Sequence, residues 1–464
     1  MEIKLVKELK QQECDILVVN VFEGEKSSEE LVNKYAIEED KFEGKLGTTY
    51  LLQTYGQQPA RKVLAVGFGK KEEFCPDKLR KAVGKAMKKA MTMEAKTVAF
   101  AFDNVDFDYS EQFVYGVRIA DYVFDKYKTK KEKRVETVFV DATQELVEKN
   151  EKICKAMAFA RDLANEPADY ATPTKLAELA QGFGLEAKIF EKEQCEEMGM
   201  GAYLAVAKGS SQPPKFIHLK YSVENPKKRI ALIGKGVCFD SGGLDIKPPA
   251  SMLTMKDDMS GAACVLGIMS VIKELAPQVE VHGIVAACEN MPGCSAYKPG
   301  DILTAKNGKT IEVDNTDAEG RLTLADALCY ACELGVDEVI DIATLTGACM
   351  VALGTQAAGI VGNNDELVKN LIESAKSQGE RFWELPMYEE YKESLKSNVA
   401  DMQNTGARWG GASTAGLFLQ EFVKDVKWSH IDIAGVAYHD KPQGEFVKGA
   451  SGAGVRALLN YVIG

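Results

Sequence analysis

The segment NTDAEGRL, residues 315–322, holds the densest group of side chains that could do chemistry. Asp317, Glu319 and Arg321 occupy alternate positions, so in an extended chain they would point to one side. Two converging carboxylates repel each other unless a cation lies between them, and a metal ion is the economical cation. A surface strand with alternating charge is the alternative. The run from a strand-like stretch directly into a helix with apolar faces favours the metal site.

A second glycine-rich segment, GKGVCFDSGGLDIKP at 234–248, follows the apolar run RIALI and is therefore expected at the end of a strand. Its chemical residues are Lys235, Asp240 and Lys247. Its glycines allow tight turns or the close approach of the backbone to a ligand. A lysine–aspartate ion pair without further chemistry is the structural alternative.

The third segment, MKDDMSGAA at 255–263, contains the adjacent residues Asp257 and Asp258. An extended chain turns only one of two adjacent side chains inward. The small residues that follow suit the start of a helix packed tightly against its neighbours. An aspartate there could also have the purely structural role of favouring the helix N-terminus.

Together the three segments offer several oxygen ligands in a chain with few histidines. Four carboxylates suit two divalent metal ions of the zinc, manganese or magnesium type. Two such ions can activate a bridging water and clamp the reacting group. The candidate residues are Asp240, Asp258, Asp317 and Glu319, with Lys235 and Lys247 nearby.

Other catalytic motifs are absent or incomplete. The sequence has no HExxH, and the stretches GASTAG and GASGAG only approach the GxSxG of serine hydrolases. Leu303 stands where a phosphate loop ending in NGKT needs its first glycine, and Phe239 stands at the third glycine position of GxGxxG. The sequence therefore argues against a serine hydrolase, a P-loop enzyme and a dinucleotide-binding enzyme.

Alternating strands and helices must position these residues. The pattern predicts an α/β protein of two domains: a smaller N-terminal α/β domain over 1–145 and a larger catalytic α/β domain over 166–464 with a mixed central sheet flanked by helices. A connecting helix is expected over 146–165. In open α/β sheets, sites form outside the carboxyl ends of the strands. The expected strands are 16–22, 62–69, 97–102, 135–140, 216–222, 229–239, 279–289, 337–347 and 428–435.

Composition narrows the location and the partners. The formal charge of -12 argues against nucleic acid or anionic membrane as the main partner, and the basic run 128–134 fits a solvated loop or helix end. Eleven scattered cysteines and the lack of a signal peptide predict a reduced, cytoplasmic protein. The uncharged stretch 342–362 is rich in glycine and threonine, so a buried strand followed by a helix or loop is expected rather than a membrane span.

The three segments resemble the metal-binding segments of the leucyl aminopeptidase family of metallopeptidases. NTDAEGRL matches that family's signature at every position, and the other two segments agree in order and spacing. The resemblance covers about 165–464, and it includes DIATLTGA, HIDIAG and KGASGAGVRALL further along the chain. The sequence departs from the family pattern at Asp169, where an asparagine is usual, and at Asp257, where a small residue is usual.

The resemblance implies a role for each matching residue. Asp240 and Glu319 would bridge two metal ions, Asp317 would complete one metal site, and Lys235 with Asp258 would complete the other. Lys247 would polarise the scissile carbonyl. The implied bicarbonate, a general base, would be held by Arg321 with the backbone of Ala318 and Gly320, and the implied first-residue pocket would be formed by Met255, Thr344 and Gly347.

The resemblance also implies the activity and the assembly. The expected activity is an aminopeptidase that releases Leu, Met and other uncharged N-terminal residues from peptides. It would use two divalent ions per subunit, Zn²⁺ or Mn²⁺ with Mg²⁺ as a further candidate. A homohexamer is implied. Three alternatives stay open: a narrow dipeptidase acting on substrates such as Cys-Gly, a protein that binds DNA or a nucleotide, and an inactive scaffold.

Overall fold

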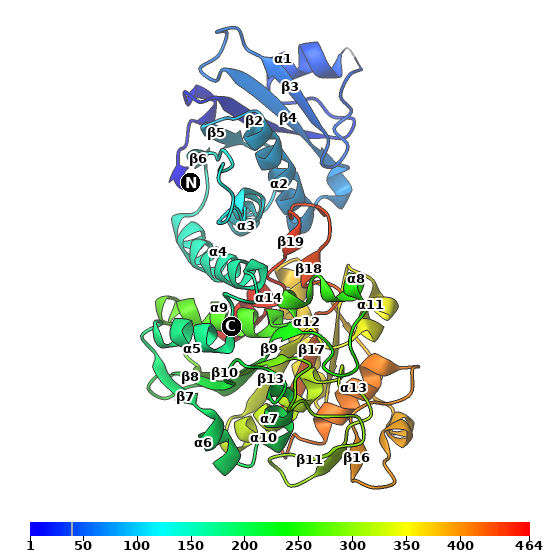
Figure 1. The fold of residues 1–464 in the computed structure, drawn as a ribbon. Helices are drawn as coiled ribbons and strands as arrows, with labels where there is room; N and C mark the ends of the chain where they lie inside the picture. Colours follow the sequence, from blue (N-terminus) through cyan, green and yellow to red (C-terminus); the bar gives the residue numbers. More distant parts are fainter. Residues whose placement is uncertain (39) are drawn as a thin grey trace. The chain divides into compact units, whose positions relative to one another are not determined.

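Buried apolar runs form the central strands of two sheets, each in its own unit of the chain (Figure 1). The computed structural model describes residues 1–38 and 40–464. One unit comprises Met1–Cys154 with His439–Lys448, and the other comprises Lys155–Tyr438 with Gly449–Gly464. The boundary falls inside helix α4 (Gln144–Asn165), and the return of residues 439–448 to the first unit was not anticipated from the sequence.

The first unit contains a six-stranded sheet in the order β1-β6-β5-β2-β4-β3. All pairings are parallel except that of β3 with β4. Every residue of β2 is buried, as a parallel strand covered on both faces requires. Helices α2 and α3 pack against each other beside this sheet (Figure 1). The strands are β1 Glu2–Leu5, β2 Ile16–Phe22, β3 Thr49–Gln53, β4 Lys62–Gly69, β5 Thr97–Ala101 and β6 Thr137–Val140, and the α-helices are α1 Glu30–Val32, α2 Pro76–Thr92 and α3 Ser110–Asp121.

The basic run of the first unit lies in an exposed loop. Lys128 pairs with Glu132 at 2.7 Å, and Lys133 pairs with Glu94. Lys131 donates to the backbone carbonyl of Asp125 at 2.5 Å. The run is therefore a solvated loop whose charges engage neighbouring acids and backbone oxygens.

The second unit contains an eight-stranded mixed sheet in the order β15-β14-β17-β13-β9-β10-β8-β7. The central strands β17, β13, β9 and β10 are parallel to one another, whereas β14 pairs with β17, β8 with β10, and β7 with β8 in antiparallel fashion. The predicted α/β class with a mixed central sheet is confirmed. The strands are β7 Glu186–Phe190, β8 Lys215–Tyr221, β9 Arg229–Asp240, β10 Glu280–Asn290, β13 Glu338–Ala343, β14 Ala358–Gly362, β15 Phe382–Glu384 and β17 Lys427–Asp432.

Helices flank this sheet, and a small sheet of short strands lies beside it in the order β11-β12-β16 (Figure 1). The helices are α5 Pro173–Gln181, α6 Lys192–Glu197, α7 Gly201–Ala207, α8 Pro249–Met252, α9 Ser260–Leu275, α10 Gly320–Glu333, α11 Gly347–Leu353, α12 Asp365–Ser377, α13 Gly411–Gln420 and α14 Val455–Ile463. The short strands are β11 Ile302–Thr304, β12 Thr310–Glu312 and β16 Met402–Gln403.

The uncharged stretch 342–362 continues β13, forms α11 and then enters β14. A strand followed by a helix, as predicted, therefore accounts for its apolar character. Among the described residues, no helix combines the length and the apolar character needed to cross a membrane.

Candidate metal centre

Strand β9 carries Lys235 within its length and Asp240 at its end. In a regular strand two residues five positions apart face opposite sides. The register of β9 against β10 shifts, however: Val237 is opposite Cys288, and Asp240 is opposite Asn290. Three steps along β9 thus match two along β10, so β9 contains a bulge. Because a bulge re-aims the side chains that follow it, Lys235 and Asp240 can serve one site.

The segment 315–322 is not an extended strand, so the expected geometry of alternating residues is wrong. Strand β12 ends at Glu312, a turn includes Thr316 and Asp317, and α10 begins at Gly320. Asp317 is held in this turn because its backbone N–H donates to Asn315 Oδ1 at 2.7 Å. Glu319 occupies the N-cap position of α10 without a side-chain capping hydrogen bond, and Arg321 lies in the first turn of that helix. A turn and a helix start therefore bring the acids together.

Asp258 reaches the cluster from a short 3₁₀ turn, Met255–Asp257, that leads into α9. Both Asp257 and Asp258 are buried, although an extended chain would have turned only one inward. Gly261 permits the tight packing of this helix start, because a Cβ there would lie 2.0 Å from the carbonyl oxygen of Ile342 on β13. The predicted helix start with small residues is confirmed.

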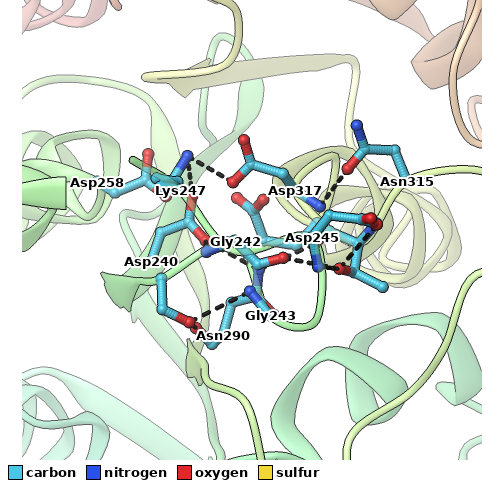
Figure 2. A network of polar contacts seen from close by, with 12 residues as sticks. Asp240, Gly242, Gly243, Asp245, Lys247, Asp258, Asn290, Asn315 and Asp317 are labelled. Atoms are coloured by element: carbon cyan, nitrogen blue, oxygen red, sulfur yellow. Dashed lines mark hydrogen bonds and ion pairs between the residues drawn. The ribbon is translucent and has the colours of Figure 1, made fainter. Parts of the chain in front are cut away.

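Two lysines bridge the four carboxylates. Lys235 Nζ lies 2.7 Å from Asp258 Oδ1 and 2.8 Å from Glu319 Oε1. Lys247 Nζ lies 2.8 Å from Asp240 Oδ2 and 2.5 Å from Asp317 Oδ1, and Figure 2 shows this lysine between the two acids. All six side chains that the sequence singled out as ligands or neighbours lie in one cluster, because oxygen atoms of Asp240, Asp317 and Glu319 within 4.8 Å of one another join the two lysine-centred groups.

The approach of Lys235 to Glu319 depends on Gly320, the residue that follows Glu319 and begins α10. A Cβ at Gly320 would lie 2.5 Å from Lys235 Cε and 2.7 Å from its Nζ. Any other residue there would displace the lysine. Gly242 has a similar role in the second half of the cluster, since it adopts φ +87° and a Cβ there would lie 2.9 Å from Asp317 Oδ1.

The donor set fits divalent cations. Oxygen atoms of Asp240, Asp317 and Glu319 all lie within 4.8 Å of one another. Asp258 Oδ2 is buried and has no hydrogen-bond partner among the described residues. Four carboxylates face only two lysine ammonium groups, so the buried cluster carries an excess of negative charge that hard cations with oxygen ligands neutralise.

The electrostatics of the metal-free cluster reflect this excess. Burial raises the pKa of Asp317 to about 6, and the neighbouring carboxylate of Asp240 contributes to the rise. Burial likewise raises the pKa of Asp258, which Lys235 lowers only in part. Burial alone would lower the pKa of Lys235 and Lys247, but the adjacent carboxylates outweigh it and hold both above their ordinary value. Without metal, both lysines are therefore cations.

Arg321 is buried beside the cluster. Its Nη1 donates to the carbonyl oxygen of Asn404 at 2.8 Å, and its Nε has no hydrogen-bond partner among the described residues. Burial lowers the pKa of this guanidinium to about 10, so it remains charged at neutral pH. A buried cation with a free donor suits a small anion. Ala318 and Gly320, whose backbone amides the resemblance assigns to the same anion, follow the turn and begin α10, and the Ala318 N–H donates to the carbonyl oxygen of Asn315 at 3.3 Å.

The residues expected to form the first-residue pocket lie on two different segments. Met255 is half-buried at the start of the 3₁₀ turn, and Gly347 is the exposed first residue of α11. Thr344 follows β13 and is tied to the metal cluster itself: its Oγ1 donates to Asp258 Oδ1 at 2.9 Å, and its carbonyl oxygen accepts from Lys235 Nζ at 3.0 Å.

Several residues of the site were missed from the sequence. Asn290, Thr316 and Asp245 connect the ligand-bearing segments: Thr316 Oγ1 donates to the carbonyl oxygen of Gly242 at 2.7 Å, and Thr316 N–H donates to Asp245 Oδ2 at 2.7 Å. Asn404 accepts from the N–H of Asp314 at 2.8 Å. Asn290 had one available signal, its place as a polar residue at the carboxyl end of a predicted strand.

The four histidines lie outside the carboxylate cluster. His218 and His282 pair with each other at 2.8 Å, and His430 Nδ1 pairs with Asp341 Oδ1 at 2.5 Å. The fold and the carboxylate–lysine cluster together define a two-domain α/β protein with a candidate metal centre at the ends of parallel strands.

Comparison with known families completes the assignment. The model of the cytosol aminopeptidase family catalytic domain matches residues 158–459, and that of its N-terminal domain matches residues 18–131. The chain therefore belongs to the cytosol aminopeptidase family, as the sequence resemblance suggested.

Individual relatives agree over nearly their full lengths. A probable cytosol aminopeptidase of Alkaliphilus oremlandii is 42% identical and matches 100% of this chain and 99% of its own. One from Persephonella marina is 45% identical, with 92% and 90% covered. Among solved structures, a variant of tomato leucine aminopeptidase has a TM-score of 0.89 at 37% identity, covering 100% of this chain and 96% of its own. The bottromycin maturation enzyme BotP in complex with Mn has a TM-score of 0.88 at 32% identity, covering 97% and 98%.

Proposed function

We propose that this aminopeptidase releases N-terminal amino acids from peptides with a water molecule activated by two divalent metal ions. Membership of the family supports aminopeptidase activity, and the connected cluster of four carboxylates and two lysines is the observation that carries the metal mechanism. In this proposal Asp240 and Glu319 would be shared by the two ions. Asp317 would complete one metal site, and Lys235 with Asp258 would complete the other. Lys235 would ligate as the neutral amine, because an adjacent dication disfavours the ammonium form that the metal-free cluster holds.

When bound, the metal ions supply an activated water and a place for the free amino group of the substrate. That requirement for a free amino terminus explains exopeptidase action. Lys247 is half-buried, with 14% of its side chain exposed, and as a cation between Asp240 and Asp317 it would donate to the scissile carbonyl. A preorganised donor of this kind stabilises the negative charge that develops on the carbonyl oxygen.

Arg321 holds bicarbonate as a general base in this proposal, with backbone amides of Ala318 and Gly320 assisting. The buried guanidinium, whose Nε has no hydrogen-bond partner within the described part of the chain, supports an anion there. Met255, Thr344 and Gly347 form the pocket for the first residue. Thr344 contacts the metal cluster through Asp258, so a pocket at this place would lie next to the reacting bond. We propose a preference for Leu, Met and other uncharged residues.

The metal identity and the assembly are part of the same proposal. The Mn in the BotP complex supports Mn²⁺ as one candidate. Carboxylate oxygens also suit Zn²⁺ and Mg²⁺, and of these two Zn²⁺ is the one that readily takes a nitrogen ligand as well. A cytoplasmic homohexamer is proposed from the family resemblance, and light scattering of the purified protein measures its mass.

The test is hydrolysis of Leu-p-nitroanilide by purified protein after chelation, followed by addition of Mn²⁺, Zn²⁺ or Mg²⁺. We expect metal-restored release in the wild type and none in Asp317→Ala. The matched control is Asp365→Ala, an exposed aspartate at the start of α12 in the same unit, which should keep wild-type activity. A lack of release with every metal, on this substrate and on dipeptides that include Cys-Gly, would refute the proposed function.

A further inference from the structure

Asn290, the last residue of β10, links two of the segments that carry the proposed ligands. Its side chain is fully buried, with 0% of its surface exposed. Asn290 Nδ2 donates to Asp240 Oδ1 at 2.8 Å and to the carbonyl oxygen of Thr316 at 2.9 Å. One amide group therefore ties the end of β9 to the turn that precedes α10 (Figure 2).

The bulge in β9 creates this contact. Without the register shift, Asn290 would stand opposite Phe239, whereas the observed register places it opposite Asp240. Paired residues of parallel strands share a face of the sheet, so the bulge brings the amide and the carboxylate to the same side. The backbone holds Asn290 there, because its carbonyl oxygen accepts from Ser241 N–H at 3.0 Å and from Ser241 Oγ at 2.7 Å.

The two oxygens of Asp240 have different partners. Oδ1 accepts from Asn290 Nδ2 and from the backbone N–H of Gly242 at 2.9 Å. Oδ2 faces Lys247 Nζ instead. Two N–H donors thus fix the plane of the carboxylate and leave Oδ2 directed into the cluster, where a cation would lie.

The oxygen of the Asn290 side chain takes no part in these hydrogen bonds. Asn290 Oδ1 is buried and has no hydrogen-bond partner among the described residues. It faces Gly243, where a Cβ would lie only 2.8 Å away. A buried acceptor without a partner costs stability, so the position favours an amide for its donors and not for its oxygen.

We propose that Asn290 is a positioning residue that orients the Asp240 carboxylate for metal binding, an inference that rests on the proposed two-metal function. Groups that hold a metal ligand from behind fix its direction, and their loss typically weakens metal affinity by about 10- to 100-fold. Asn290→Leu keeps the approximate shape and removes both donors, and Asn290→Ala removes them with the side chain.

The experiment titrates Mn²⁺ into chelated full-length protein by calorimetry and records the melting temperature of each metal-free variant. We expect both Asn290 variants to bind Mn²⁺ about 10- to 100-fold more weakly than the wild type. The matched control is Asn150→Leu, which replaces another fully buried asparagine, in the first unit, whose Nδ2 donates to the carbonyl oxygen of Leu146 at 2.8 Å. It should lower the melting temperature without changing Mn²⁺ affinity.

Mn²⁺ affinity within about threefold of the wild type in a folded Asn290 variant would overturn the inference and leave the proposed function standing, since tenfold is the smallest expected loss. Failure of both Asn290 variants to fold, with Asn150→Leu folded, would assign the residue to folding and also overturn it. A wild-type protein that binds no Mn²⁺, Zn²⁺ or Mg²⁺ would instead contradict the proposed function itself.

Discussion

Two buried polar clusters lie on the eight-stranded sheet of the second unit, and they differ in how completely their groups are paired. On β8 and β10, His218 Nε2 contacts His282 Nδ1 at 2.8 Å, His218 Nδ1 contacts Tyr330 OH at 2.9 Å, and His282 Nε2 contacts Glu280 Oε1 at 3.1 Å. Every ring nitrogen of this histidine cluster has a partner. In the carboxylate cluster, by contrast, four acids share two lysines and Asp258 Oδ2 has no partner among the described residues.

Burial affects the two clusters in opposite ways. It lowers the pKa of His218 to about 4 and lowers that of His282, so both rings are neutral at neutral pH. Burial raises the pKa of Asp317 to about 6, but the carboxylate cluster stays charged because its lysines are cations. The histidine cluster needs no ligand, because its rings are neutral and its one carboxylate, Glu280, pairs with Lys220 at 3.1 Å, whereas a charged and incompletely paired cluster is stabilised by a cation. Incomplete pairing at strand ends, and not burial of polar groups as such, marks the candidate site.

The largest expected effect is a loss of catalytic activity that occurs when the carboxylate cluster is altered but not when the histidine cluster is. Glu319→Gln removes a proposed bridging charge and should lower kcat/KM by about 10³-fold, or about 4 kcal/mol of transition-state stabilisation. Glu280→Gln, in the histidine cluster, should change kcat/KM by less than about threefold, since it lies away from the proposed ligands. Steady-state kinetics with added Mn²⁺ measures both, and equal losses in the two variants would erase the distinction between the clusters.

The next effect tests whether Lys247 acts on the substrate or only balances charge. Lys247→Met should lower kcat by about 10²- to 10³-fold, because the proposed oxyanion loses its donor. The bound metal, measured by elemental analysis, should stay at the wild-type level. Lys228→Met is the control, because this lysine also pairs with a buried acid of the sheet, Glu338, at 2.8 Å. A Lys247 variant with normal kcat would remove this lysine from the mechanism.

A smaller effect should appear in the histidine cluster as a pH dependence of stability. The folded protein holds the pKa of His218 at about 4, below its ordinary 6.5, so the unfolded chain takes up a proton first as the pH falls. The stability from the neutral ring is full above pH 6.5 and is lost toward pH 4, by about 3 kcal/mol. Denaturant unfolding of the wild type and of His218→Gln measures this. If the free energy of unfolding of His218→Gln falls as steeply between pH 6.5 and pH 4 as that of the wild type, His218 is not the group responsible.

The smallest effect is expected outside both clusters, in the basic loop of the first unit. Lys130 is exposed, and Lys130→Ala should change the free energy of unfolding by less than about 0.5 kcal/mol. Activity on Leu-p-nitroanilide should equal that of the wild type. A large loss of either would show that charge density alone, without burial or incomplete pairing, can mark a functional region of this protein.

Sequence patterns predicted most of the central strands well, although they missed the buried strand β14, and they predicted the edge strands of both sheets poorly. Strands β2 and β4 have the predicted bounds, 16–22 and 62–69, because parallel strands covered on both faces need continuous apolar runs. The partly exposed β3 and the edge strand β7 were missed. Their residues are only half-buried or exposed, so the pairing with a neighbouring strand, and not composition, makes them strands.

The sequence by itself determined which residue types could form the site, because acids, lysines and glycines at these spacings have few other uses. Only the tertiary structure decided how they meet. Side chains along a regular strand alternate between the two faces of the sheet, so residues an odd number of positions apart face opposite sides. The bulge in β9 shifts this alternation by one residue between Lys235 and Asp240. The contact of Asn290 with Asp240 joins positions 50 residues apart. Such a contact depends on strand register, which becomes defined only when the sheet is assembled.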